Sequence, residues 1–302
     1  MQSWDLSRKI MVTQTRIIEW YQHYKGKVYV AFSGGKDSTV LLHIVRQIFP
    51  DVPAVFVDTG LEFPEVRLFA RQQENVIVLR PEMNFRKVIE TYGYPVVSKR
   101  VADTVEYGSK PGSYRWKELH GEIIRSNGTP SEFNCEKWCY LLDAPFKVSS
   151  KCCNIMKKKP MKKYAKETGR VPIIATMADE SRSRRAVWMK QGCNAFNKKD
   201  PSSQPMSFWT ENDVLEYLYT YNVPYAPVYG EIVQCGGGWT TTGEHRTGCV
   251  FCAFGAHLEK SPNRFQRLKI THPKLWNYCM RSWDEHGLGM REVLEYIGVN
   301  CG

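Results

Sequence analysis

The sequence predicts a doubly wound α/β fold with a mainly parallel sheet. Short apolar, β-branched runs recur along the chain, amphipathic helical patterns separate them, and polar stretches follow directly where these runs end. Apolar strands alternating with helices are typical of a parallel sheet covered on both faces. Functional loops are then expected at the carboxyl ends of the strands.

The expected elements follow in chain order. Helices are expected over about residues 1–25, 37–48 and 66–73, and strands at residues 28–32, 54–58, 76–79 and 171–178. Residues 98–165 form an irregular, basic insertion between the last two strands. Loop-rich sequence begins near residue 230, with helical patterns after it. We therefore predict a nucleotide-binding α/β domain over residues 1–230 and a C-terminal, partly helical module over residues 231–302.

Composition narrows the functional class. The 302 residues are 42% hydrophobic and 24% charged, as in an ordinary globular protein. No run approaches about 18 apolar residues, so no membrane span is expected. The first helix carries Asp5 and Glu19 and does not resemble a signal peptide, which makes the cytoplasm the expected compartment. The formal net charge of +11 favours polyanionic partners such as nucleotide phosphates, sulfate esters or nucleic acid.

A candidate anion-binding loop, residues 33–38 ("SGGKDS"), joins the first strand to the next helix. Free backbone N–H groups and the positive end of a helix dipole attract anions at such a position. Gly34 and Gly35 allow close approach of the backbone, and Lys36 adds charge. The spacing is not that of a Walker A motif. A Gly-Gly turn capped by Asp37 or Ser38 is the alternative.

The motif "SGGKDS" resembles the PP-loop of the adenine-nucleotide α-hydrolase (HUP) superfamily. "VDTGLEFPE" after the second strand resembles the phosphoadenylyl-sulfate (PAPS) reductase branch. The resemblance implies chemistry at the nucleotide α-phosphate or at an attached sulfonyl group, with Lys36 as the catalytic cation and Mg²⁺ as a candidate companion ion. The nucleotide-binding residues that it implies are Ser33, Gly34, Gly35, Lys36, Asp37, Ser38, Asp58, Thr59 and Gly60.

The chain has ten cysteines. Disulfides are rare in a reducing compartment, so clustered cysteines there indicate metal or redox chemistry. Adjacent Cys152 and Cys153, with the C-x-x-C pair Cys249 and Cys252, supply four thiolates, the number that a [4Fe–4S] cluster or a tetrahedral zinc ion takes. The pattern resembles that of bacterial adenylyl-sulfate (APS) reductases, which implies the cluster. Met156 departs from it, standing where those enzymes carry arginine.

Cationic side chains accompany both motifs. Arg182, Arg184 and Arg185 follow the strand at 171–178, and guanidinium groups suit phosphate or sulfate. The family's Arg/Ser motif at this place implies nucleotide contact. Lys157 and Lys158 follow the cysteine pair and are expected to hold an anionic substrate. A solvated basic surface is the alternative for both groups.

The C-terminal segment separates two enzymatic hypotheses. Sulfonucleotide reductases carry a Glu-Cys-Gly-x-His segment whose cysteine attacks the sulfonyl sulfur. Here "VNCG" places Cys301 before a glycine, with Asn300 in the glutamate position. We expect an ATP-adenylating, pyrophosphate-releasing sulfur transferase acting on tRNA or DNA. The alternatives are an APS or PAPS reductase with Cys301 as nucleophile and a thioredoxin-like partner, and a non-catalytic nucleotide- or nucleic-acid-binding subunit.

Overall fold

The computed structural model describes all 302 residues, and they form two compact units. The sheet unit comprises residues 1–81 and 157–247, and the cysteine unit comprises residues 82–156 and 248–302. The four candidate metal-binding cysteines all belong to the cysteine unit. This grouping places a boundary after Thr247, whereas the sequence analysis places one after residue 230, and the domain assignment stays a prediction.

A six-stranded sheet forms the core of the sheet unit and confirms the predicted fold class. Its strand order is β3-β2-β1-β5-β7-β6, and all pairs are parallel except β6 with β7. The strands are β1 (Val28–Phe32), β2 (Ala54–Val57), β3 (Val76–Leu79), β5 (Val171–Ile174), β6 (Asn194–Ala195) and β7 (Ser202–Ser203). The sequence analysis missed β6 and β7 because each has two residues and neither has an apolar run.

Two of the four predicted strands match the structure in full, β1 and β3. The other two end earlier than expected. The strand predicted over 171–178 stops at Ile174, because the Thr176 backbone N–H bonds back to the Ile174 carbonyl at 3.0 Å and turns the chain. The polar loops therefore begin closer to the sheet than the apolar pattern indicated.

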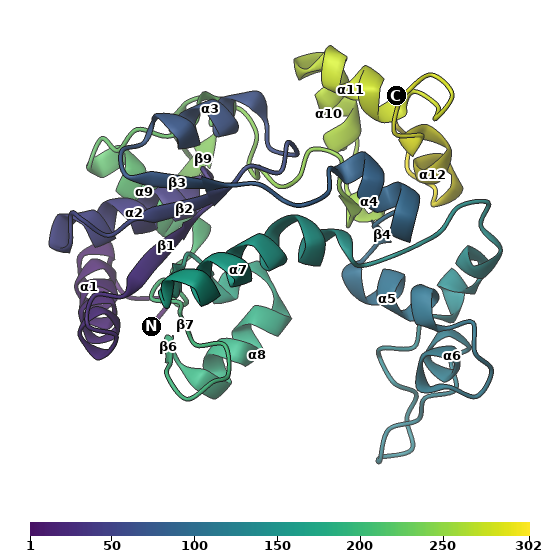
Figure 1. Cartoon of the computed structure of the whole chain (residues 1–302), viewed down its shortest axis with the longest axis horizontal. Helices are drawn as coiled ribbons and strands as arrows, with labels where there is room; N and C mark the ends of the chain where they lie inside the picture. The colour runs from purple at the N-terminus through teal and green to yellow at the C-terminus, as the bar shows by residue number, and fades with distance from the viewer. The chain divides into compact units, whose positions relative to one another are not determined.

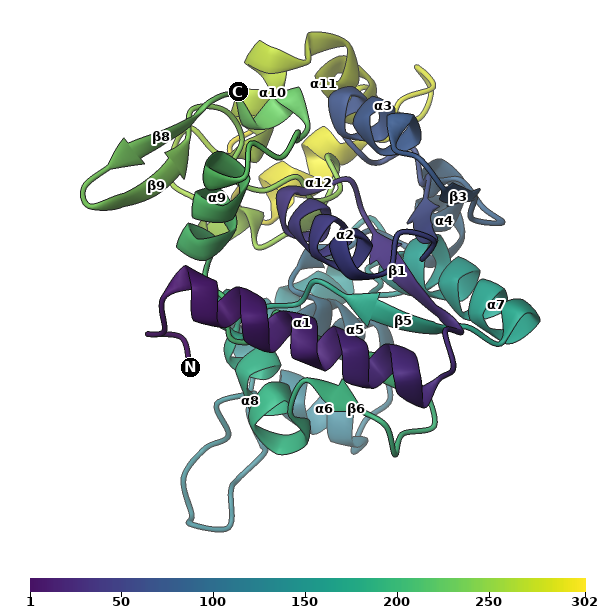
Figure 2. The same ribbon diagram turned by 90° about the vertical axis from the view of Figure 1, so that its left-hand side faces the viewer.

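Helices cover both faces of the sheet (Figures 1 and 2). They are α1 (Leu6–His23), α2 (Lys36–Ile48), α3 (Pro64–Gln72), α7 (Lys159–Thr168), α8 (Arg182–Gln191) and α9 (Glu211–Thr220). Right-handed crossovers place α2 and α3 on one face and α7, which precedes β5, on the other. On that second face Tyr164 packs against Tyr29 and Val55. A hairpin of β8 (Ile232–Cys235) and β9 (Gly238–Thr241) follows α9.

The cysteine unit is mainly helical. Its elements are α4 (Phe85–Tyr92), β4 (Val96–Val97), α5 (Lys99–Tyr107), α6 (Tyr114–Leu119), the 3₁₀ helix η1 (Glu136–Asp143), β10 (Ala253–Phe254), the 3₁₀ turn η5 (Ala256–Leu258), α10 (Arg264–Thr271), α11 (Pro273–Met280) and α12 (Met290–Tyr296). Strands β4 and β10 pair in parallel and join the insertion to the C-terminal segment. Tyr94 strengthens this junction, because its hydroxyl donates to the Leu288 carbonyl at 2.7 Å. None of the helices combines the length and apolar character that crossing a bilayer requires.

A buried ion pair fixes α1 against α9. The Lys9 ammonium lies 2.6 Å from the Asp213 carboxylate, and both side chains are almost fully buried. The same carboxylate accepts the Thr210 backbone N–H at 2.6 Å, so it also closes the N-terminal cap of α9. Beside this pair the Trp209 indole N–H donates to the Thr13 hydroxyl at 2.8 Å.

Replacing Lys9 with methionine should destabilise the protein by about 3–5 kcal/mol, because Asp213 would keep a buried charge without its cation. The midpoint of urea unfolding measures this loss. Lys166→Met, on the exposed side of α7, is the matched control and should leave the midpoint nearly unchanged. Equal midpoints for the two variants would contradict the role assigned to the pair.

Candidate functional site

Residues 33–38, the phosphate loop, form a tight turn between β1 and α2. Gly35 is the N-cap of α2, so the first free N–H groups of the helix lie at the loop. Gly34 has a φ of +72°, and a Cβ there would lie 2.9 Å from Val66, so only glycine fits. The Ser38 hydroxyl lies 3.0 Å from the Ser33 hydroxyl and donates to the Gly35 carbonyl at 2.9 Å. The loop is held in shape by its own side chains.

Lys36 is buried at this loop, with 4% of its surface exposed. Its ammonium lies 3.0 Å from the Glu211 carboxylate, 3.6 Å from that of Asp37 and 3.0 Å from the His245 carbonyl oxygen. Burial by itself would lower the pKa of Lys36, but the charges of Asp37, Tyr229 and Glu211 outweigh it and raise that pKa. Lys36 therefore remains a cation at neutral pH.

A distant segment of the sheet unit rests on the phosphate loop. Tyr229, at the end of the 3₁₀ turn η4 (Pro227–Tyr229), accepts the Lys36 backbone N–H on its hydroxyl at 3.0 Å. That hydroxyl lies 2.6 Å from the Thr247 hydroxyl. A Cβ on Gly35 would meet the Tyr229 hydroxyl at 3.2 Å, so the absence of a side chain there permits the contact.

The sequence analysis assigned no role to these contact residues, which are Glu211, Tyr229, His245 and Thr247. Tyr229 is separated from Lys36 by 193 residues, and no spacing rule links the two. The only available signal was the polar loop "GEHRT" before the C-x-x-C pair, which carried no assigned task. Tertiary packing alone brings this loop onto the helix start.

Asp58, Thr59 and Gly60, predicted beside the nucleotide, form a self-contained turn after β2. The Asp58 carboxylate pairs with Arg67 at 2.8 Å and with Arg71. Burial opposes ionisation of Asp58, but the hydrogen bonds and charges of the two arginines outweigh it and lower its pKa. The Thr59 hydroxyl donates to Glu62 at 2.8 Å. Nucleotide contact by these residues stays a prediction.

The three predicted arginines lie in the first turns of α8, which Ser181 caps. Arg184 pairs with Glu180. Burial and the nearby charge of Arg246 lower the pKa of Arg184, while Asp37 of the phosphate loop acts in the opposite sense. Arg184 is therefore electrostatically coupled to Asp37 of the phosphate loop, although all three arginines are exposed.

The predicted cysteine set is arranged from two local structures. Cys152 and Cys153 begin a helical run that continues through a π-helical turn, η2 (Asn154–Lys158), and such turns are frequent at functional sites. Their sulfur atoms lie 3.9 Å apart. Cys249 and Cys252 form a tight turn in which the Cys252 N–H donates to the Cys249 carbonyl at 3.0 Å.

The two cysteine pairs are electrostatically coupled to one another. The pKa of Cys152 is raised strongly by its hydrogen bond to Cys153, by burial and by the charges of Cys252 and Cys249. Burial, followed by Cys249, raises the pKa of Cys252 to about 11, although the Phe254 N–H and Arg264 act against them. A set of thiols whose charges oppose one another's ionisation suits a bound cation or cluster, which would favour the thiolate forms. No three metal-binding side chains converge to ligand distances, so a metal centre here stays a prediction.

Lys157 and Lys158 are the last two residues of this π-helical turn. The Lys157 ammonium lies 3.5 Å from the Glu62 carboxylate in the sheet unit, and its side chain is about two-fifths exposed. Its predicted contact with an anionic substrate stays a prediction, as does that of Lys158.

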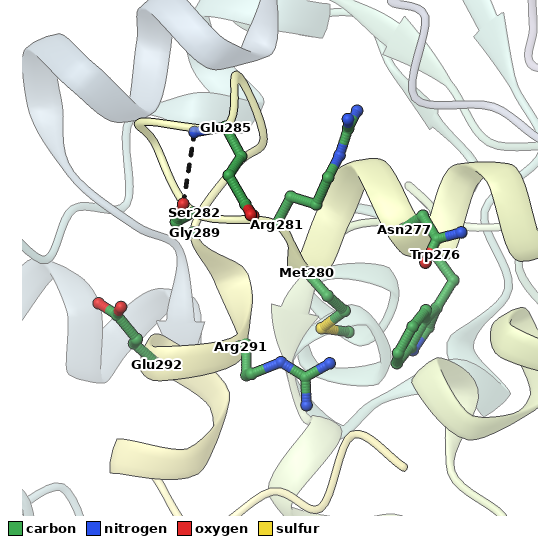
Figure 3. Close-up of a pocket in the computed structure, with 9 residues that line it drawn as sticks. All are labelled: Trp276, Asn277, Met280, Arg281, Ser282, Glu285, Gly289, Arg291 and Glu292. Carbon is green, nitrogen blue, oxygen red and sulfur yellow. Dashed lines mark hydrogen bonds between the residues drawn. The ribbon is translucent and has the colours of Figure 1, made fainter.

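Cys301, the predicted nucleophile, is buried. Only 2% of its surface is exposed, and its carbonyl accepts the Trp276 indole N–H at 3.1 Å. Burial raises the pKa of the Cys301 thiol although Arg291 acts against this. Trp276 and Arg291 line a cavity of about 280 Å³ between α11 and α12. In Figure 3 the Arg291 guanidinium extends toward the part of this cavity that Met280 and Trp276 line. Cys301 is not among the lining residues, and its catalytic role stays a prediction.

Replacing Tyr229 with phenylalanine should loosen the phosphate loop, because the Lys36 N–H would lose a partner worth about 1–3 kcal/mol when buried. Hydrogen–deuterium exchange should accelerate about tenfold or more at residues 34–38 and remain unchanged in β1. Tyr225→Phe, which loses only a bond to the Gly230 carbonyl, is the control. Unaltered exchange at the loop in Tyr229→Phe would refute this role.

Comparison with known proteins identifies a family model and relatives that are similar to this chain. Residues 27–103 and 129–244, more than half of the chain, match the family model described as phosphoadenosine phosphosulfate reductase domain. An uncharacterised protein of Methanocaldococcus jannaschii is 25% identical over 287 residues, 92% of this chain and 53% of that protein. The chain thus spans about half the length of this relative.

Two further proteins to which this chain is similar carry functional names. An adenosine 5'-phosphosulfate reductase of Bacillus cereus is 24% identical over 220 residues, covering 70% of this chain and 72% of the reductase. The solved U34-tRNA thiolase NcsA from Methanococcus maripaludis, with its [4Fe-4S] cluster, aligns with a TM-score of 0.37 and 13% identity over 98% of this chain and 82% of its own. On the family match, which includes the phosphate loop, this chain belongs to the phosphoadenosine phosphosulfate reductase domain family.

Proposed function

We propose that this chain is an iron–sulfur enzyme that binds ATP at the phosphate loop, adenylates a nucleic-acid substrate with release of pyrophosphate, and transfers sulfur to the adenylated position with release of AMP. The observation that carries the proposal is the environment of Lys36. A buried, charged ammonium and a backbone N–H of the same residue meet at a helix start in a glycine loop. This combination suits the phosphates of a nucleotide.

Phosphate binding would replace contacts that the protein makes with itself. A phosphate oxygen would take the Lys36 N–H from the Tyr229 hydroxyl and share the ammonium with Glu211. Lys36 would then neutralise the charge that develops on the departing pyrophosphate. The Asp37 and Glu211 carboxylates beside it are the oxygen ligands that Mg²⁺ prefers.

The four cysteines of the cysteine unit would hold the [4Fe–4S] cluster. Such a cluster supplies iron at which sulfur can be bound or electrons exchanged. The donor set supports this, since the charges of neighbouring thiols raise the pKa of Cys152 and of Cys252, and a bound cation would offset that repulsion. Zinc is the alternative: Zn–S bonds of about 2.3 Å put tetrahedral sulfur ligands roughly 3.8 Å apart. The Cys152–Cys153 separation of 3.9 Å is close to that value.

A second candidate is a sulfonucleotide reductase, favoured by the Bacillus cereus relative and by Cys301. The Cys301 thiolate would attack the sulfonyl sulfur of APS or PAPS, and the nucleotide phosphate would leave. A thiol of a thioredoxin-like partner would then release sulfite. The burial of Cys301 and its raised pKa weigh against this candidate, because the thiol must first be exposed and ionised.

Product analysis distinguishes the two reactions. Anaerobically purified protein given ATP, with and without tRNA or DNA, should form AMP and pyrophosphate, and Lys36→Met should lower this rate at least about 100-fold. Lys27→Met, an exposed lysine just before β1, is the control and should retain full activity. Sulfite from APS or PAPS that disappears in Cys301→Ser would replace the ATP proposal by the reductase.

The metal proposal has its own test. Protein purified without oxygen should be brown and contain about four iron atoms and four sulfides per chain. Cys153→Ser should lose most of this iron, whereas Cys235→Ser, at an exposed cysteine of the sheet unit, should retain it. Colourless protein with one zinc ion per chain would contradict the cluster without affecting the nucleotide proposal.

A further inference from the structure

The cysteine unit carries a second thiol site, apart from the four-cysteine set. Cys139 lies in the 3₁₀ helix η1, and His120 caps the C-terminal end of α6. The Cys139 sulfur lies 3.7 Å from Nε2 of His120. A thiol and an imidazole at this distance can exchange a proton directly.

The His120 ring is held in a defined orientation. Its Nδ1 lies 2.8 Å from the Trp116 carbonyl oxygen, and the ring stacks on the Trp116 indole with centroids 4.0 Å apart and an angle of 21° between the planes. A carbonyl oxygen can only accept, so the hydrogen bond assigns the proton to Nδ1. Nε2 is therefore left as the acceptor that faces the Cys139 thiol.

The combination of solvent exposure and an imidazole contact distinguishes Cys139 from Cys135 and Cys235. Cys139 is partly exposed and His120 is exposed, so a small molecule can reach the pair. Cys135, one turn earlier, is buried, and burial raises its pKa to about 11, which keeps it an unreactive thiol. Cys235 is more exposed than Cys139 but lies in strand β8 of the sheet unit without an imidazole contact.

We propose that Cys139 and His120 form an activated thiol–imidazole pair whose substrates are low-molecular-weight disulfides, which makes Cys139 a site of reversible S-thiolation. His120 Nε2 takes the thiol proton, and the Cys139 sulfur attacks one sulfur of the disulfide. The disulfide bond breaks, a mixed disulfide forms on Cys139, and the departing thiolate receives the proton from His120. One disulfide is exchanged for another, so no further oxidant is needed. The pair stands independently of the function proposed above.

Alkylation rates test the pair on full-length protein purified under anaerobic conditions. Peptide mass spectrometry after timed exposure to iodoacetamide at pH 7.0 should show Cys139 reacting about tenfold faster than Cys235, the internal control. His120→Gln should bring the Cys139 rate down to that of Cys235. Trp116→Phe, which keeps a stacking ring and the carbonyl, should preserve it, and Trp116→Ala should lower it.

A disulfide probe tests the reaction itself. Incubation with glutathione disulfide should add one glutathionyl group to the Cys139 peptide in the wild-type protein and much less in His120→Gln, and a thiol reductant should remove it. Equal alkylation rates for Cys139 and Cys235, or an unchanged rate in His120→Gln with native circular dichroism, would overturn the proposal. The comparison of Cys139 with Cys235 uses the wild-type protein, so it tests the proposal even if the His120→Gln variant does not fold.

Discussion

The hydrogen bond from the Lys36 backbone N–H to the Tyr229 hydroxyl is the contact on which the candidate nucleotide site depends. It satisfies a donor at the start of α2 that the helix itself cannot satisfy. It also fixes the segment from Tyr229 to Thr247 over the loop, together with the contact of the Lys36 ammonium to the His245 carbonyl. The loop geometry and the position of this segment are therefore set together.

Two lysine ammonium groups are buried in the sheet unit, which costs desolvation free energy. Each is tolerated because carboxylates lie beside it. Lys9 is buried because Asp213 neutralises it and also caps α9. Lys36 is buried beside two carboxylates, which keep it charged. The first arrangement joins two helices and leaves no room for a ligand. The second contains a charge that a phosphate can share, because one of its partners, Glu211, is about two-fifths exposed.

The cysteines separate by environment in the same way. Cys152 and Cys252 lie among other thiols, where each charge would make the next harder to form, and such a set is stable as thiolates only around positive charge. Cys279 and Cys301 are buried, and that burial raises the pKa of each. Cys139 alone is described beside an oriented imidazole. Ten cysteines thus divide into groups with different chemistry, and spacing in the sequence identified only the first.

The sequence by itself determined the strand–loop–helix unit at residues 28–48 and the mainly parallel sheet of apolar strands, because strand periodicity, glycine turns and helix N-termini are local properties. It also identified the four metal-binding candidates from their spacing. Only the tertiary structure decided which residues meet Lys36, that Cys301 is buried, and that His120 faces Cys139. Those contacts join residues far apart in the chain. The packing of many side chains determines these contacts, and no local sequence pattern predicts that packing.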